Sequence, residues 1–217
     1  MVRGAMALQI VEAVFLKSAT KESEWPVGTI PEVAFVGRSN VGKSSMLNRL
    51  TKHGKLARVS NTPGRTRLLQ FFEVAFLPSP AAKPVRVRFC DLPGYGFAKV
   101  AKSEQAEWAK MIEEYLTRRQ SLRTVVLIVD IRHPPPESDQ QALDFLRQSG
   151  RDVLVAATKA DKLAKSHRLP ALRQVESTLG LPRDGAVLFS AEEGTGADAL
   201  WMRIKAVAMG PKEPTEG

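Results

Sequence analysis

The stretch EVAFVGRSNVGKSS, residues 32–45, decides the fold of this chain. It opens with an apolar run typical of a buried strand and leads through a glycine-containing loop into an amphipathic segment. The loop has P-loop spacing: four residues separate its first glycine from Gly-Lys-Ser. In such loops backbone N–H groups surround a β-phosphate, the lysine reaches β- and γ-phosphate oxygens, and the hydroxyl binds magnesium. The loop residues expected to bind a nucleotide are Gly37, Arg38, Ser39, Asn40, Val41, Gly42, Lys43 and Ser44.

Short apolar runs alternate with amphipathic segments along the rest of the chain. The expected strands are residues 32–37, 68–77, 85–91, 124–130, 152–158 and 185–190, and the expected helices are residues 43–52, 103–119, 137–149, 165–179 and 195–208. This alternation predicts an α/β fold with a mostly parallel six-stranded sheet and helices on both faces. Only PSPAAKP, residues 78–84, separates the second and third strands, which is too short for a helical crossover. We therefore expect one antiparallel strand.

The composition is that of an ordinary globular protein. The chain has 217 residues, of which 43% are hydrophobic and 25% charged, and this length suits one domain. A single cysteine, Cys90, excludes an internal disulfide framework. No apolar run approaches the ~18–20 residues of a membrane helix, and Glu12 interrupts the N-terminal apolar segment, so neither a membrane span nor a signal peptide is expected. We expect an N-terminal extension at 1–31 that packs on or precedes the domain, a nucleotide-binding domain at 32–209 and a disordered tail at 210–217.

The sequence TKAD at 158–161 indicates which base is bound. A carboxylate at its last position, Asp161, can accept hydrogen bonds from the N1–H and the exocyclic amine of guanine, whereas adenine offers no such donor pair. The stem of Lys159 can lie along the purine face, with Ala160 between the two. Ras-like proteins usually carry Asn where this chain has Thr158. The motif favours GTP or GDP over an ATP-using P-loop enzyme, and nucleotide competition separates the two.

Two further loops follow strands and complete the expected site. In DLPG at 91–94, Asp91 is placed to hold magnesium through water, and the Gly94 N–H can meet a γ-phosphate, with Leu92 and Pro93 between them. After the last strand, the backbone N–H groups of Phe189, Ser190 and Ala191 are expected near guanine O6. An ordinary exit from strand to loop is the alternative for this last segment.

The segment RVSNTPGRTRLL, residues 58–69, is expected to close over the nucleotide. A threonine here completes the magnesium shell when the γ-phosphate is present, and Thr66 is preferred because it follows the Gly64 turn and Arg65 just before a strand. Thr62 as the ligand, or a simple Pro-Gly turn, are the alternatives. Lys43, Thr66 and Gly94 are thus the candidate catalytic residues, and the candidate magnesium ligands are Ser44, Thr66 and Asp91.

Two residues bear on the rate of hydrolysis. Ras-type enzymes place a water-orienting Gln after the D-x-x-G motif, but here Tyr95 follows, so unaided hydrolysis should be slow. In a subset of GTPases an Asn at the position of Asn40 helps to seat a monovalent cation, which makes potassium a candidate cofactor. The alternative is an Asn kept for its turn preference.

Positive charge is concentrated around the P-loop. Residues 33–72 contain no Asp or Glu but eight basic residues, namely Arg38, Lys43, Arg49, Lys52, Lys55, Arg58, Arg65 and Arg67. This exceeds what one nucleotide needs, so a surface that binds RNA phosphates in a nucleotide-dependent way is expected, with a solvated basic face as the alternative.

The assembled motifs resemble the bacterial EngB (YsxC/YihA) family of ribosome-biogenesis GTP-binding proteins, within the TRAFAC class. The matching stretches are VAFVGRSNVGKSS, LARVSNTPGRTRLLQFFEV, DLPGYGFAKV, EYLTRRQSL, DIRHPPPESDQQ and TKADKL, between about residues 32 and 163. The resemblance implies a Ras-like P-loop GTPase domain and a monomeric, cytoplasmic, magnesium-dependent GTPase that acts on the large ribosomal subunit or its precursor and rRNA, with links to cell division and septation. A GTP-gated ribosome- or RNA-binding module with negligible hydrolysis of its own is the alternative.

Overall fold

The structure is a computed structural model that describes residues 8–54, 56–57, 68–95 and 102–210, with only the backbone described at 102–108. Its strands are β1 (Gln9–Ala19), β2 (Glu32–Gly37), β3 (Leu69–Leu77), β4 (Val85–Asp91), β5 (Leu122–Asp130), β6 (Asp152–Thr158) and β7 (Ala186–Leu188). Its helices are α1 (Lys43–Leu50), α2 (Lys102–Arg118), α3 (Glu137–Gln148), α4 (Lys165–Thr178) and α5 (Ala197–Met209), with short 3₁₀ turns at Glu22–Glu24 and Ala160–Lys162.

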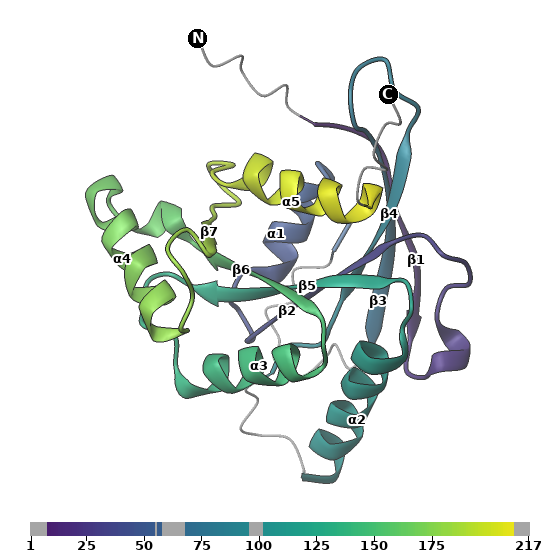
Figure 1. The fold of residues 1–217 in the computed structure, drawn as a ribbon, viewed down its shortest axis with the longest axis horizontal. Helices are drawn as coiled ribbons and strands as arrows, with labels where there is room; N and C mark the ends of the chain where they lie inside the picture. Colours follow the sequence, from purple (N-terminus) through teal and green to yellow (C-terminus); the bar gives the residue numbers. More distant parts are fainter. Residues whose placement is uncertain (1–7, 55, 58–67, 96–101, 211–217) are drawn as a thin grey trace, which may run out of the picture.

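The seven strands form one sheet in the order β1-β3-β4-β2-β5-β6-β7 (Figure 1). Strand β3 is antiparallel to both of its neighbours, β1 and β4, and the other pairs are parallel. The α/β fold class and the single antiparallel strand are therefore confirmed. The expected number of six strands is too low, because the segment before residue 32 contributes β1 at the sheet edge.

Strand β1 cannot be predicted from the sequence, because its side chains do not alternate between buried and exposed. Bulges interrupt its pairing with β3 between Ile10 and Glu12 and between Phe15 and Lys17. Each bulge inserts a residue and shifts the two-residue period by one position. Val11 and Leu16, the inserted residues, are exposed. The period-two pattern that identifies a strand is thus broken twice within eleven residues.

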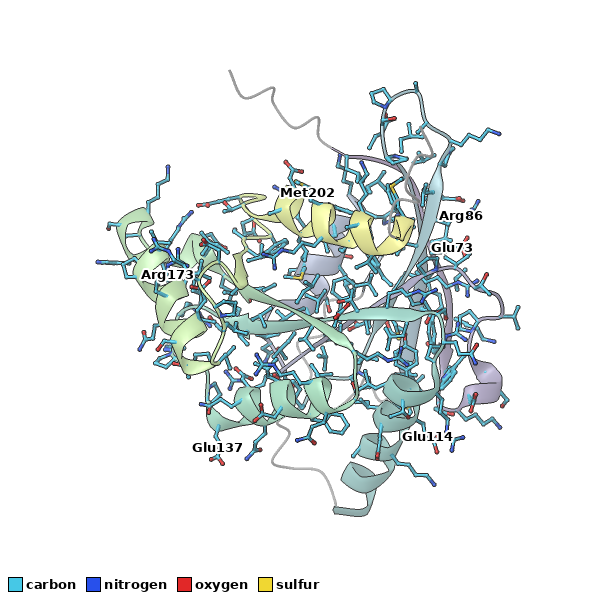
Figure 2. The ribbon with its side chains drawn as sticks, viewed as in Figure 1. Glu73, Arg86, Glu114, Glu137, Arg173 and Met202 are labelled. Atoms are coloured by element: carbon cyan, nitrogen blue, oxygen red, sulfur yellow. The ribbon has the colours of Figure 1, made fainter. Side chains whose placement is uncertain are left out.

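Helices cover both faces of the sheet, as the sequence predicts (Figure 1). One core lies between the sheet and α2, α3 and α4 and includes Tyr115, Leu143 and Val175. The other lies beneath α1 and α5 and includes Met46 and Trp201. Figure 2 shows Glu137 and Met202 pointing outward from α3 and α5, away from these cores. Within the described ranges, no helix has the length and apolar character to cross a membrane.

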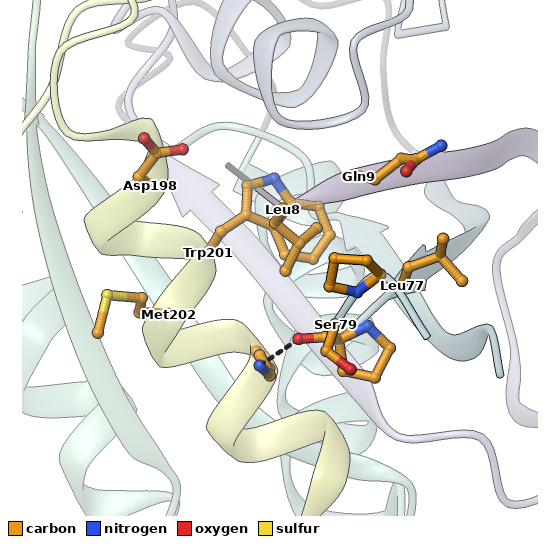
Figure 3. Close-up of a pocket in the computed structure, with 10 residues that line it drawn as sticks. Leu8, Gln9, Leu77, Ser79, Asp198, Trp201 and Met202 are labelled. Atoms are coloured by element: carbon orange, nitrogen blue, oxygen red, sulfur yellow. Dashed lines mark hydrogen bonds between the residues drawn. The ribbon is translucent and has the colours of Figure 1, made fainter. Parts of the chain in front are cut away.

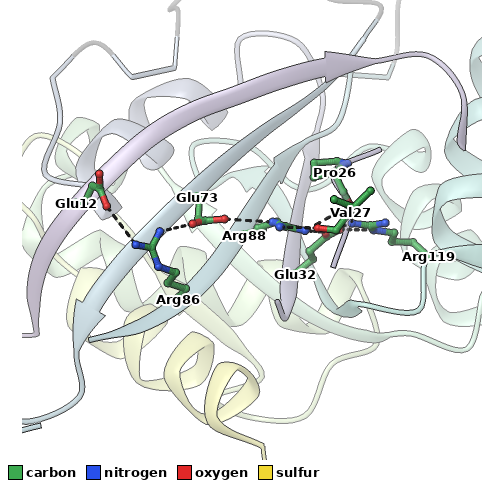
Figure 4. A network of polar contacts seen from close by, with 8 residues as sticks. All are labelled: Glu12, Pro26, Val27, Glu32, Glu73, Arg86, Arg88 and Arg119. Carbon is green, nitrogen blue, oxygen red and sulfur yellow. Dashed lines mark hydrogen bonds and ion pairs between the residues drawn. The ribbon is translucent and has the colours of Figure 1, made fainter. Parts of the chain in front are cut away.

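A buried ionic network attaches the N-terminal segment to the sheet (Figure 4). The carboxylate of Glu32, fully buried at the start of β2, accepts hydrogen bonds from Arg119 and from the Tyr115 hydroxyl at 3.0 Å. Arg119 also donates to the Pro26 carbonyl at 2.6 Å, and Arg88 donates to the Val27 carbonyl at 2.9 Å. Removing one partner from such a buried pair is costly because it leaves an uncompensated charge. The segment before β2 is therefore anchored.

Helix α5 fixes the far end of α1. The Trp201 indole N–H donates to the Leu50 carbonyl at 2.9 Å, which satisfies a carbonyl at the C-terminus of α1. Beside it, Lys205 donates to the Pro78 carbonyl at 2.7 Å, across a shallow pocket that Leu8 and Trp201 also line (Figure 3). These contacts hold α1, whose other end forms part of the P-loop, in a defined position on the sheet.

Candidate nucleotide-binding site

The P-loop leaves the sheet at the end of its most buried strand. Every residue of β2 is buried, and the strand pairs in parallel with β4 on one side and β5 on the other. A Cβ atom at Gly37 would lie 2.7 Å from the Ile128 carbonyl oxygen, so only glycine fits there. Gly42 caps α1 at φ 102°, a conformation that favours glycine, and Lys43 begins the helix. The strand–loop–helix context that the motif requires is therefore present.

Lys43 and Asp91 meet at the mouth of this loop. The Lys43 ammonium donates a hydrogen bond to Asp91 Oδ1, and their side chains are only 12% and 6% exposed. Removal from water lowers the pKa of Lys43 to about 7. Ser44 follows Lys43 in the first turn of α1. A hydroxyl and a carboxylate so placed form the hard oxygen donor set that suits Mg²⁺.

The first two residues of TKAD contact the P-loop from the end of β6, which β5 separates from β2. Thr158 Oγ1 lies 2.6 Å from the Val41 carbonyl oxygen and 2.9 Å from that of Val129. Lys159 Nζ donates to the Asn40 carbonyl at 2.6 Å and lies 2.9 Å from Asp130 Oδ2. At Thr158, where Ras-like proteins usually carry Asn, the hydroxyl thus supplies a hydrogen bond to the loop. These contacts fix the end of the Lys159 side chain beside the loop, and its stacking on a purine stays a prediction.

The last residue of TKAD faces the segment after β7. Ser190 Oγ donates to Asp161 Oδ1 at 2.8 Å, and the Lys162 ammonium lies 3.1 Å from Oδ2. Burial raises the pKa of this carboxyl. The hydrogen bonds from Ser190 and Lys162 lower it by more, so the pKa lies below its usual value. Backbone bonds from Ala160 N to the Phe189 carbonyl and from Phe189 N to the Ala157 carbonyl join the two loops. Phe189 and Ser190 are buried, and Ala191 is half-buried.

The DLPG segment lies directly against the P-loop. The N–H of Leu92 donates to the Phe35 carbonyl at 2.9 Å, and Leu92 and Pro93 are buried. A Cβ atom at Gly94 would lie 3.0 Å from the Gly37 carbonyl oxygen and 3.3 Å from Ser39 N. The structure therefore brings Gly94 together with the P-loop, Lys43 and Asp91 at one edge of the sheet.

Some expected residues lie outside the described ranges, and two others were missed. Gly64, Arg65, Thr66 and the alternative Thr62 belong to the undescribed segment 58–67. The missed residues are Asp130, at the carboxyl end of β5 beside Lys159, and Asp139 in α3, which accepts a hydrogen bond from the Tyr95 hydroxyl. A signal existed for Asp130, because carboxyl ends of parallel strands meet at the ligand edge of an α/β sheet.

Hydrogen bonds lower the pKa of Asp130 far below its usual range. Burial acts in the opposite direction, but Arg132 donates two hydrogen bonds from its guanidinium and one from its backbone N–H, and Lys159 adds a further contact. Asp130 is therefore a fixed anion under all ordinary conditions. Its Oδ2 lies 2.9 Å from the Lys159 ammonium and so helps to fix that side chain.

The fold and this set of loops define a P-loop GTPase of the Ras-like class. The chain matches the family model described as "50S ribosome-binding GTPase" over residues 32–159. It is 62% identical to the probable GTP-binding protein EngB of Anaeromyxobacter sp. (strain K) over 203 residues, 94% of either chain. Identity to the EngB protein of Pelotomaculum thermopropionicum is 47% over 194 residues, 89% of this chain and 93% of that one. The chain belongs to the EngB family of GTP-binding proteins, and it is a GTPase.

Solved structures agree with this placement. The crystal structure of a probable GTP-binding protein EngB superposes with a TM-score of 0.60 at 26% identity, over 82% of this chain and 98% of that one. Era in complex with MgGDPNP and nucleotides 1506–1542 of 16S ribosomal RNA superposes with a TM-score of 0.63 at 22% identity, over 88% of this chain and 60% of that one. The likeness to Era shows a common fold alone.

Proposed function

We propose that this GTPase is a nucleotide-dependent switch in assembly of the large ribosomal subunit, with a link to cell division and septation. One observation carries the proposal: the loop edge of the sheet gathers the P-loop, the Lys43–Asp91 pair and the Asp161 carboxylate, near the exposed Arg49 of α1 and Lys52 just after it. Membership of the EngB family supports it, and that role places the protein in the cytoplasm. We further propose that residues 32–209 form the working domain and that it acts as a monomer.

Within this proposal each loop has a separate task. The P-loop N–H groups would bind the phosphates and Lys43 would neutralise their charge, and Ser44, Thr66 and Asp91 are the residues that would hold magnesium. Asp161 accepts the two guanine donors and Lys159 covers the base, while Ala160 and the N–H groups of Phe189–Ala191 complete the base pocket. Ser190 keeps the Asp161 carboxylate oriented, because it donates to one of its oxygens. Magnesium bound with the triphosphate supplies charge neutralisation at the β- and γ-phosphates.

Hydrolysis should be slow without a partner. The residue after Gly94 is Tyr95, whose hydroxyl donates to Asp139 and is therefore directed into the protein. It supplies neither the carboxamide nor the base that would orient an attacking water. Lys43, Gly94 and Thr66 remain to stabilise the charge of the transition state. The alternative, a GTP-gated binding module with negligible hydrolysis, is tested by comparing turnover with and without ribosomal particles.

Potassium is expected to accelerate turnover through Asn40. The Asn40 backbone has φ 60°, and Lys159 donates to its carbonyl oxygen, so the residue is fixed within the P-loop. That positive φ equally suits an asparagine chosen for its turn preference. Rates in potassium and in sodium at equal ionic strength should therefore differ for the parent and coincide for Asn40→Ala. Equal parental rates would remove the cation role from Asn40.

The ribosomal contact is proposed for the basic face that borders α1. Arg49 and Lys52 are exposed at the C-terminal end of the helix. The Lys52 ammonium donates to a backbone carbonyl, that of Leu8, and so keeps its charge available. Lys55 and Arg58 belong to the same face by sequence but lie outside the described residues. Phosphate contacts of this kind give salt-dependent binding with little sequence preference.

Neutralising these four residues together, as Arg49→Gln, Lys52→Gln, Lys55→Gln and Arg58→Gln, should weaken binding to ribosomal subunits in the presence of a GTP analogue. For every RNA phosphate that the variant no longer neutralises, the log–log salt slope should fall by about 0.7–0.9. Co-sedimentation with 50S subunits across a salt series measures both the affinity and the slope, with GDP as the comparison state.

A matched quadruple variant controls for net charge. It neutralises four exposed residues on other elements, Lys110, Arg147, Lys165 and Arg183. This control should bind subunits as the parent does at moderate salt. If the α1-face variant retains the parental affinity and salt slope while it still binds nucleotide, the basic stretch is a solvated face and the ribosomal contact lies elsewhere.

A further inference from the structure

The side chains of three residues from three different segments meet at the P-loop, and two of them, Tyr95 and Asp139, are not among the residues assigned above to phosphate, magnesium or base. The Tyr95 hydroxyl donates to Asp139 Oδ1 at 2.9 Å, and Arg38 Nε lies 3.1 Å from the same oxygen. Asp139 stands in the first turn of α3 and is only 1% exposed. We call Arg38, Tyr95 and Asp139 the clasp, because the side chains of a P-loop residue and of the residue after DLPG both contact the same carboxylate.

The backbones of the two outer members are joined as well. Arg38 and Tyr95 form an isolated parallel bridge that continues the pairing of β2 with β4 beyond the strand ends. Gly94 immediately precedes Tyr95 and lies against the Gly37 carbonyl and the Ser39 backbone. Gly94 therefore cannot withdraw from the P-loop unless Tyr95 leaves Asp139 or α3 moves with it.

Buried polar atoms in the clasp and beside it lack a hydrogen-bond partner within the described part of the chain. Asp139 Oδ2 and Ser39 Oγ are buried and have no hydrogen-bond partner among the described residues. Burial raises the pKa of the Asp139 carboxyl although Tyr95 and Arg38 act to lower it. Burial and this carboxylate also raise the pKa of the Tyr95 hydroxyl, which keeps it a donor. Among the described residues, one oxygen of this buried carboxylate is unpaired, which costs free energy and reduces the net stability of the contact.

The arrangement that the clasp maintains does not suit a γ-phosphate. An oxygen hydrogen-bonded to both the loop and the Gly94 N–H needs about 2.9 Å on each side. A Cβ atom at Gly94 would already lie 3.0 Å from the Gly37 carbonyl oxygen and 3.3 Å from Ser39 N, so the loop backbone leaves no room for a further atom on that side of Gly94. Lys43 meanwhile contacts Asp91 directly, although the proposed function assigns these two groups to phosphate and to the magnesium shell. A diphosphate makes no demand on Gly94, whereas a triphosphate must displace it.

We propose that Asp139 is a positioning residue that holds Tyr95, and through it Gly94, against the P-loop, so that it lowers the affinity for GTP relative to GDP. Binding of the γ-phosphate opens the clasp and releases the N-terminus of α3, which places a nucleotide signal on that helix. This inference rests on the proposed nucleotide site. It adds to that site a residue, Asp139, that contacts no nucleotide yet sets the preference between GTP and GDP.

The test compares Tyr95→Phe with a matched variant. Both Tyr95 and Tyr115 donate a hydroxyl to a buried carboxylate, at 2.9 Å to Asp139 and 3.0 Å to Glu32, so Tyr115→Phe removes the same kind of bond away from the loop edge. Titration with fluorescent GDP and with a fluorescent non-hydrolysable GTP analogue gives both affinities. Tyr95→Phe should raise the analogue-to-GDP affinity ratio about tenfold, since a hydrogen bond to a charged group is removed from one state only. Tyr115→Phe should leave the ratio at the parental value.

Asp139→Asn provides a second variant of almost the same shape, with exposed Asp144→Asn on the same helix as its control. The amide oxygen still accepts a hydrogen bond from Tyr95, but the charge that strengthens this bond is gone, so the ratio should shift in the same direction as in Tyr95→Phe and by less. The double variant should shift it no further than Tyr95→Phe alone. An unchanged ratio, or a fall, in Tyr95→Phe and Asp139→Asn would overturn the role of the clasp while both nucleotides still bind. If the parent itself binds neither guanine nucleotide, the proposed site fails first.

Discussion

Asp161→Asn should lose affinity for GTP and gain affinity for xanthosine triphosphate. Guanine presents two donors to the carboxylate, whereas xanthine presents an oxygen where guanine has its amine, and an asparagine amide can donate to that oxygen. Losing a charge-assisted pair costs on the order of 1.5–3 kcal/mol, a fall in GTP affinity of about 10- to 150-fold. Competition between GTP and xanthosine triphosphate for the purified variant measures the exchange.

The control is Asp184→Asn, which removes the same charge from an exposed carboxylate paired with Arg173. Its nucleotide preference should equal that of the parent. The local geometry favours a clean result at position 161, since an amide can still accept the hydrogen bond from Ser190. Unchanged GTP affinity in Asp161→Asn would assign guanine selection to another residue.

Lys43→Ala should abolish binding of both GDP and GTP. The lysine is placed to contact two phosphates, and losing charge-assisted bonds to both reduces affinity by about 100-fold or more. Ser44→Ala should remove the magnesium dependence of binding without removing a charge. Isothermal titration with and without magnesium separates the two effects, and Lys165→Ala, on an exposed part of α4, serves as the lysine control.

The melting temperature of the Lys43→Ala variant provides a second measurement. Lys43 pairs with a carboxylate that is 6% exposed, so its removal leaves Asp91 buried without its partner and should lower the melting temperature. The double variant Lys43→Ala, Asp91→Asn should recover part of that loss yet still fail to bind nucleotide. Nucleotide binding by a folded Lys43→Ala protein would contradict the assignment of the P-loop lysine.

The sequence reveals those parts of the fold whose cause is local. The strand before the P-loop is an unbroken apolar run because parallel neighbours bury both of its faces, and its observed bounds equal the expected ones. The antiparallel β3–β4 pair follows from a connection too short for a helix. Strand β1 has no such local signature, because the partner that makes it a strand, β3, lies far along the chain and two bulges disturb its period.

The residues of the candidate site also differ in whether a local sequence motif identifies them. Gly42, Lys43 and Asp161 stand in motifs whose spacing reflects one loop and its ligand. Asp139 stands in no such motif, since its contacts are to Arg38 and Tyr95, about a hundred and about forty residues away along the chain. Its polar character alone suggests a solvent-facing first-turn residue, which is a common helix preference. Only the packing of α3 against the loop edge turns it inward.

The edge position of β1 has a consequence for synthesis. Phe15 packs against Phe72, its pairing partner in β3, which lies 57 positions later in the chain. At ~5–20 residues per second, translation delivers that partner about 3–11 seconds after β1 emerges. Throughout this interval the apolar side chains of β1 have no strand to lie beside, and the nascent chain carries an uncovered segment prone to pairing with other chains. Once β3 has paired with β1, the bulges at Val11 and Leu16 interrupt the regular ladder of this edge strand, so the irregularity that hides β1 in the sequence makes the folded edge a poor template for pairing with other chains.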